Sequence, residues 1–127
     1  MSENKRVTGI GGIFFKSKNH KSLLEWYQTH LGIKMEDWGG SVFKWRDQED
    51  PDKENYSVFS IFTEDTDYLD PSKASFMINF RVDDLKSVVK DIKAEGQNIS
   101  EIQETPQGLF AWIIDPDGNK VELWQDL

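Results

Sequence analysis

The sequence contains no cysteine, only two histidines and only four prolines among its 127 residues. The lack of cysteine excludes disulfides, zinc–thiolate clusters, iron–sulfur centres and thiol nucleophiles. No apolar run approaches the roughly 18 residues that a membrane span needs, and the first residues do not lead into the apolar core of a signal peptide. We therefore expect a cytoplasmic protein without a membrane partner.

Positive charge is also scarce, because 15 Lys and Arg residues stand against 23 Asp and Glu residues, giving a formal net charge of −8. Binding of nucleic acid through its phosphates needs clustered basic side chains, so nucleic acid is not expected as a partner. Hydrophobic residues make up 37% of the chain and aromatic residues 13%, which is enough for a buried core. We expect a single domain over residues 1–127.

The two halves of the chain resemble each other at an offset of 65 residues, as between Phe15 and Phe80. The same offset aligns residues 21–24 with residues 86–89, and Asp-Pro-Asp at 50–52 with Asp-Pro-Asp at 115–117. Two separate matches at one offset indicate an internal repeat. The repeat predicts two modules, about 7–64 and about 74–127.

Each half has the pattern of a strand, a helix and then three short strands, or βαβββ. In the first half a helix should begin after Asn19, whose side chain would cap it, and end at Gly32. A strand beginning near Ile33 would then form a hairpin with a strand at 42–45.

The second half repeats this order with stronger signals. Residues 76–82 alternate as a half-buried strand, Asp83 or Asp84 would cap the next helix, and Gly96 would end it. Asp-Pro-Asp-Gly-Asn at 115–119 predicts a tight turn between the last two strands.

Two segments resemble those of a known family: Leu-Leu-Glu-Trp-Tyr at 23–27 followed by Leu-Gly-Ile at 31–33, and the ending 115–123. Together with the two βαβββ halves, they are similar to the vicinal oxygen chelate superfamily, which includes glyoxalase I, extradiol dioxygenases and the fosfomycin and bleomycin resistance proteins. The resemblance implies an α+β fold in which two tandem βαβββ modules form a curled, cup-shaped mixed sheet with helices on the outer face. It also implies a homodimer.

Within such a fold, side chains of one parity along each strand face the cup. On the first strand these are Ile10, Gly12 and Phe14. The predicted ligand-binding residues are Phe14, Ser60, Phe62, Met77, Asn79, Arg81, Trp112 and Trp124. The sequence leaves open whether Trp45 and Trp112 face the cup or the core, and whether Arg81, Lys120 and Trp124 lie instead at a rim or dimer contact.

In metal-dependent relatives, four cup positions supply the ligands of one divalent cation. The resemblance places Gly12, Val58 or Ser60, Met77 and Glu122 at these positions, and only Glu122 is a suitable ligand. One carboxylate is too few, since catalytic sites use about three protein ligands. His20 and His30 do not have the i, i+4 spacing of a helical metal motif. The sequence therefore predicts no metal cofactor and disfavours a divalent metal.

These observations favour a metal-free small-molecule-binding protein of the glyoxalase and bleomycin resistance type, which holds a cationic or planar ligand in an aromatic cup. The alternative is a lyase, isomerase or dioxygenase of the same superfamily, with Glu122 as the catalytic base or as a divalent-metal ligand. A third reading is a non-catalytic interaction module whose cup is filled by its own side chains. Glu122 could also form a structural ion pair with Arg81 or Lys120.

Overall fold

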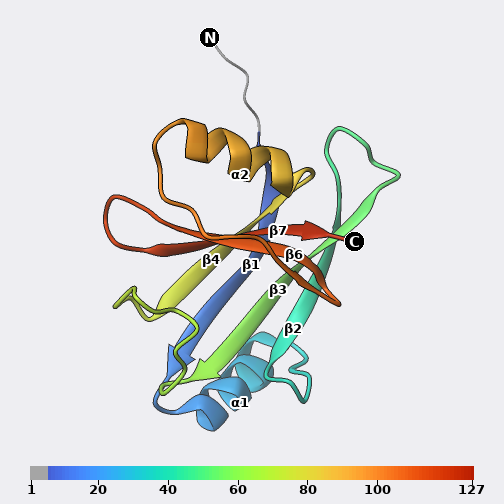
Figure 1. Ribbon diagram of the computed structural model, residues 1–127. Helices are drawn as coiled ribbons and strands as arrows, with labels where there is room; N and C mark the ends of the chain where they lie inside the picture. Colours follow the sequence, from blue (N-terminus) through green and yellow to red (C-terminus); the bar gives the residue numbers. More distant parts are fainter. Residues whose placement is uncertain (1–5) are drawn as a thin grey trace.

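The computed structural model describes residues 6–127, and Figure 1 shows them as one sheet with two helices. The first half forms β1 (Val7–Ser17), α1 (His20–Leu31), β2 (Gly40–Arg46) and β3 (Glu54–Thr63). The second half forms β4 (Phe76–Val82), α2 (Leu85–Ala94), β5 (Gln103–Thr105), β6 (Gly108–Ile114) and β7 (Lys120–Asp126). The predicted α+β class is confirmed.

The described strands form a seven-stranded mixed sheet in the order β2-β3-β1-β4-β7-β6-β5. Two pairs are parallel, β1 with β3 and β4 with β7, and the other pairs are antiparallel. The central β1–β4 pair joins the two halves edge to edge. Figure 1 shows that the sheet curls, so that β6 and β7 run across the direction of β1 and β3, while α1 and α2 lie at opposite ends.

The repeat seen in the sequence is also present in the elements. The helix α1 begins at His20 and α2 begins at Leu85, 65 positions later. The predicted strand near Ile33 is wrong, because residues 32–39 form no strand and β2 pairs only with β3. The segment 34–37 contains a single apolar residue, Met35, and lacks the alternation that would hold a strand against a core. The first module is therefore βαββ, and the second is βαβββ.

The two helices begin and end differently. Asp84 accepts a hydrogen bond from the backbone N–H of Ser87, as an N-cap should. Asn19 occupies the N-cap position of α1, but its side chain makes no capping bond, so the predicted cap is wrong. At the other end of α1, Gly32 has φ 67°, a left-handed conformation that glycine adopts without strain.

The helices also bury different amounts of their surface. The helix α2 buries Leu85, Val88 and Val89 in a core with Leu123 of β7. By contrast, α1 has no buried residue. No helix of the described chain is long and apolar enough to cross a membrane.

A bulge in β1 changes which of its side chains face the cup. The pairing of β1 with β4 shifts between Ile10 and Gly12, leaving Gly11 as the extra residue. Because a bulge inverts the alternation, Ile10 lies on the outer face while Gly11 and Phe14 line the cup. The prediction that Ile10 faces the cup is therefore wrong.

Candidate functional site

The concave side of the sheet holds a cavity of about 370 Å³ between the two halves. Its wall is mostly apolar, includes five aromatic residues and comes from both modules. The lining residues are Gly11, Phe14, Trp38, Val42, Tyr56, Val58, Asn79, Gln107, Phe110, Glu122 and Trp124. An apolar cavity with a few polar groups is typical of a small-molecule site.

A buried carboxylate, that of Glu122 on β7, lies in the wall of this cavity. Its Oε1 accepts a hydrogen bond of 2.6 Å from Nδ2 of Asn79 on β4. Its Oε2 accepts one of 2.8 Å from Nε1 of Trp112 on β6 and another from the hydroxyl of Tyr68. Three neutral donors therefore hold a side chain that is only 2% exposed.

The loop between β3 and β4 packs against the strands beside the cup. Leu69 in this loop is fully buried against Phe14 and Met77, in a cluster that Phe62 and Trp112 complete. The neighbouring Tyr68 donates its hydroxyl proton to Glu122. Burial, and then the negative charge of Glu122, raise the pKa of Tyr68 well above its usual range, so Tyr68 remains a donor at neutral pH.

Arg81 lies beside the cavity, and its guanidinium is held by other residues of the chain. Its guanidinium lies over the ring of Trp124, with 4.4 Å between Cζ and the ring centroid, and over the ring of Tyr56. It donates to the backbone oxygen of Tyr56 and forms an ion pair of 3.0 Å with Asp126. Arg81 thus positions the Trp124 ring from behind. Among residues 6–127, no Lys or Arg forms an ion pair with Glu122 within 4.0 Å.

Of the predicted site residues, Phe14, Asn79, Glu122 and Trp124 line the cavity. The others are not among its lining residues. Met77, Phe62 and Trp112 belong to the Leu69 cluster, Ser60 is buried at 4% exposure, and Arg81 supports Trp124.

Sequence reasoning missed three kinds of contributor. Gly11 was hidden by the bulge, and Trp38 and Gln107 lie just outside regular strands, where alternation gives no signal. Tyr68 comes from an irregular loop.

The sequence left open whether Trp45 and Trp112 face the cup or the core, and the two side chains lie on opposite sides of the sheet. Trp112 lies on the cup side, whereas Trp45 bonds through Nε1 to Ser57, which faces the outer side.

The residues present do not fit a divalent cation. In the described chain no group of three or more His, Cys, Asp or Glu residues lies close enough to bind one. Gly12 and Val58 are paired neighbours on β1 and β3 and bring no donor atom. The neighbours of Glu122 are Asn79, Trp112 and Tyr68, which present N–H and O–H donors to it. Donors of this kind stabilise an anion and repel a metal ion.

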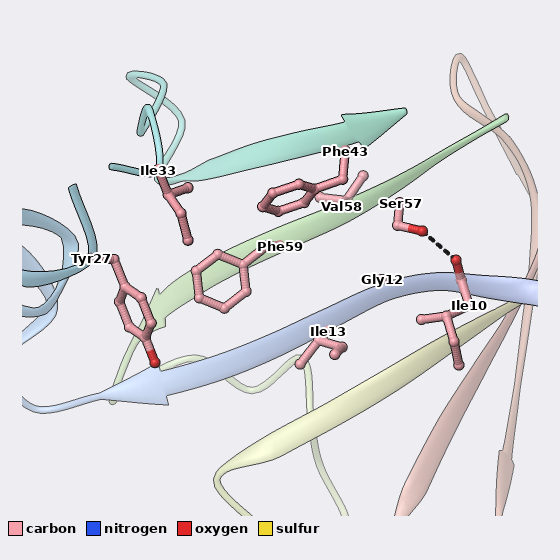
Figure 2. A pocket seen from close by; sticks show the side chains of 9 residues that line it. All are labelled: Ile10, Gly12, Ile13, Tyr27, Ile33, Phe43, Ser57, Val58 and Phe59. Carbon is pink, nitrogen blue, oxygen red and sulfur yellow. Dashed lines mark hydrogen bonds between the residues drawn. The ribbon is translucent and has the colours of Figure 1, made fainter. Parts of the chain in front are cut away.

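A second, smaller cavity of about 210 Å³ lies on the outer face of the first module. Figure 2 shows Tyr27 of α1, Phe43 of β2 and Phe59 of β3 around it, with Ile10 and Ile13 of β1 nearby. The only hydrogen bond drawn is from the Ser57 hydroxyl to the backbone oxygen of Ile10. This surface is almost entirely apolar.

The fold and the site define a class: a curled βαβββ-type sheet with a ligand-sized cup on its concave side. A family model described as the Glyoxalase/Bleomycin resistance protein/Dioxygenase superfamily matches residues 10–123. The chain belongs to this superfamily. A comparison with curated protein sequences finds no significant match.

Solved structures with the same fold include enzymes of different kinds. The methylmalonyl-CoA epimerase from Mycobacterium tuberculosis is 17% identical, with a TM-score of 0.65 over 100% of this chain and 93% of that one. The Streptomyces coelicolor methylmalonyl-CoA epimerase is 18% identical, with a TM-score of 0.66 over 94% of this chain and 98% of that one. The 2,3-dioxygenase LapB from Pseudomonas sp. KL28 is 21% identical, with a TM-score of 0.66 over 95% of this chain and 41% of that one. At these identities the likeness concerns the fold.

Proposed function

We propose that this protein binds a small organic molecule in its cup without a metal ion. The observation that supports this most is the cavity of about 370 Å³, with aromatic rings on several sides and a buried carboxylate in its wall. Its size lies in the usual range for small-molecule sites, about 300–1,000 Å³. The donor set around Glu122 further supports a metal-free site.

The ligand in this proposal is planar or cationic. Trp38 and Tyr56 of the first module, and Phe110 and Trp124 of the second, line the cavity, where a flat group can stack on a ring face that Arg81 does not cover. Uncovered ring faces attract positive charge, as does the carboxylate of Glu122. The net charge of −8 acts in the same direction over longer distances.

The proposal is tested by titrating the protein with a panel of planar cations, planar neutral molecules and planar anions while recording tryptophan fluorescence. We expect planar cations to quench it in a saturable way. Replacing Trp38, which is 54% exposed, in the variant Trp38→Ala should weaken binding about threefold to tenfold with little effect on stability.

The matched control is Trp26→Ala, because Trp26 is 49% exposed on α1 and does not line the cup. This variant should bind as the wild type does. If no member of the panel causes saturable quenching, the proposal is wrong.

A second candidate is an enzyme in which Glu122 is the base or a metal ligand. It is favoured by the position of Glu122 in the cavity wall, where Oε1 accepts a single described hydrogen bond, from Asn79. This candidate predicts turnover of an enolisable α-oxo thioester, and loss of that turnover in folded Glu122→Gln. Unchanged turnover in Glu122→Gln would exclude Glu122 from such a mechanism.

The proposal includes a homodimer that acts in the cytoplasm. The outer face of the first module exposes Ile10, Ile13 and Phe43, each at least 40% accessible, around the cavity of Figure 2. A contiguous apolar surface of this kind is typical of a protein–protein contact. A monomeric mass at micromolar concentration in solution would contradict the dimer, and fractionation of the source cells tests the compartment.

A further inference from the structure

One polar atom in the cup wall has no partner. Asn79 is 1% exposed, and its Oδ1 accepts no hydrogen bond from any residue between 6 and 127. Buried polar groups in folded proteins are nearly always paired, because an unpaired acceptor gives up its hydrogen bonds to water without replacement. An exception in the wall of a ligand-sized cavity therefore calls for a functional explanation.

The orientation of the Asn79 amide follows from its neighbour. The amide nitrogen donates to Oε1 of Glu122 over 2.6 Å. An ionised carboxylate can only accept hydrogen bonds, so the NH₂ group must face Glu122 and the carbonyl oxygen must face away. Trp112 and Tyr68 hold Glu122 from its other oxygen. Glu122 is therefore a positioning residue for the Asn79 carbonyl.

The space around Oδ1 depends on glycine. A Cβ at Gly11 would lie 2.0 Å from Oδ1 of Asn79, closer than any real contact. Only glycine at the β1 bulge allows this oxygen to approach the backbone there, and both residues line the cavity. The cavity wall also includes the aromatic rings of Phe14, Tyr56 and Trp124.

A carbonyl oxygen among aromatic faces suits a ligand with an N–H group. The Arg81 guanidinium already lies over Tyr56 and Trp124. A preference for a cation therefore rests on the remaining ring faces and on the carboxylate of Glu122 behind the amide, and the carbonyl oxygen requires a hydrogen-bond donor. We propose that Asn79 determines specificity by accepting a hydrogen bond through Oδ1 from a protonated amine or amidine on a planar organic ligand. This inference rests on the proposed function, since it concerns the same cup.

Two probes of equal charge separate the hydrogen bond from the attraction of a cation to aromatic rings. Benzylammonium carries three N–H donors, whereas benzyltrimethylammonium carries the same charge and ring but no N–H group. We expect the wild-type protein to bind benzylammonium at least about tenfold more tightly in a tryptophan-fluorescence titration. Equal binding, or tighter binding of the trimethyl probe, would overturn the inference. This comparison requires no variant to fold.

Two variants then test whether Oδ1 of Asn79 is the acceptor of this hydrogen bond. In Asn79→Leu the acceptor is lost, so the preference for benzylammonium should disappear. The matched control, Asn98→Leu, makes the same change at an exposed loop position outside the cup and should keep the wild-type preference. An unchanged preference in folded Asn79→Leu would show that another atom selects the ligand. Far-ultraviolet circular dichroism and thermal melting establish that both variants fold.

The outcomes separate this inference from the proposed function. If other planar ligands bind saturably but the two benzyl probes are not distinguished, or neither binds, the role of Asn79 is wrong and the cup remains a binding site. If no planar ligand binds, the proposed function fails and the inference fails with it.

Discussion

The two halves of this molecule share a repeat in sequence but differ in how completely they are packed. In the second module α2 buries three residues against β6 and β7, and Asp84 caps it. In the first module α1 buries none, and its N-cap side chain makes no capping bond. The second module therefore supplies the stable core. The first supplies an open wall of the cup and an apolar outer face.

The polar network follows the same division. Glu122, Asn79 and Trp112 all lie on strands of the second module, and Tyr68 comes from the loop that leads into it. The first module brings space at Gly11, three aromatic rings and two aliphatic side chains to the cup, namely Phe14, Trp38, Tyr56, Val42 and Val58. A repeat can thus place the buried polar network in one copy and mainly rings and apolar side chains in the other.

The largest expected effect is on the buried carboxylate of the second module. Glu122→Gln turns an acceptor for three donors into an amide that matches them poorly, so we expect a loss of about 3 kcal/mol in the free energy of unfolding. Urea denaturation at one protein concentration measures it.

The matched change in the first module is Glu54→Gln, where the exposed Glu54 forms only a loose ion pair of 3.8 Å with Lys44. We expect a change below about 0.5 kcal/mol. Similar losses in Glu122→Gln and Glu54→Gln would contradict the proposed importance of the network.

Truncating equivalent helix positions should give the next largest difference. Val88 of α2 is 7% exposed in the core, and the 65-residue offset aligns it with Leu23 of α1. We expect Val88→Ala to cost about 2 kcal/mol and Leu23→Ala less than about 1 kcal/mol, although leucine loses more atoms. Thermal or urea unfolding compares them, and a larger loss for Leu23→Ala would reverse the comparison.

A charge on the open face tests the dimer. Ile13 on the outer face of the first module and Ile114 on β6 are 40% and 41% exposed. If the first module forms the dimer contact, Ile13→Glu should give monomers in sedimentation or light scattering, and Ile114→Glu should remain dimeric. Dissociation by Ile114→Glu alone would place the contact on the other module.

The smallest effect concerns alkaline pH. The pKa of Tyr68 is raised in the folded state, by burial first and then by Glu122, so the folded protein holds this proton more tightly than the unfolded chain. The contribution is fully present below the ordinary tyrosine pKa of about 10 and is lost as the pH rises above it. The wild type should therefore lose more stability than Tyr68→Phe between about pH 9 and pH 11. Urea midpoints that fall in parallel would contradict this.

Much of the fold could be predicted because local signals agreed with each other. The repeat, the 76–82 alternation and the 115–119 turn each depend on a few neighbouring residues, and Asp115 indeed accepts hydrogen bonds from the backbone of Asp117 and Asn119. The prediction of a strand near Ile33 was wrong. The glycines at 39–40 suggested a hairpin turn, but residues 34–37 lack the apolar alternation of a strand that would precede it. The position of Ile10 on the outer face of the sheet could not be predicted, because the bulge depends on how β1 pairs with β4.

The site was only partly predictable for a related reason. Parity along regular strands identified Phe14, Asn79, Glu122 and Trp124, which line the cup. Parity could not distinguish lining residues from those behind the wall, such as Met77 and Arg81, because depth depends on the curl of the whole sheet. Tyr68 donates to Glu122 from the loop between β3 and β4, where no periodic pattern marks it as a site residue.

The central claim is that the cup holds an organic ligand and no metal. The most direct measurement is the native mass spectrum of the untagged protein, purified gently from its own cells, compared with the mass of the denatured chain. We predict a metal-free assembly, with any excess mass matching an organic molecule that benzylammonium displaces. An excess that matches one divalent cation per chain and disappears with a chelator would contradict the claim.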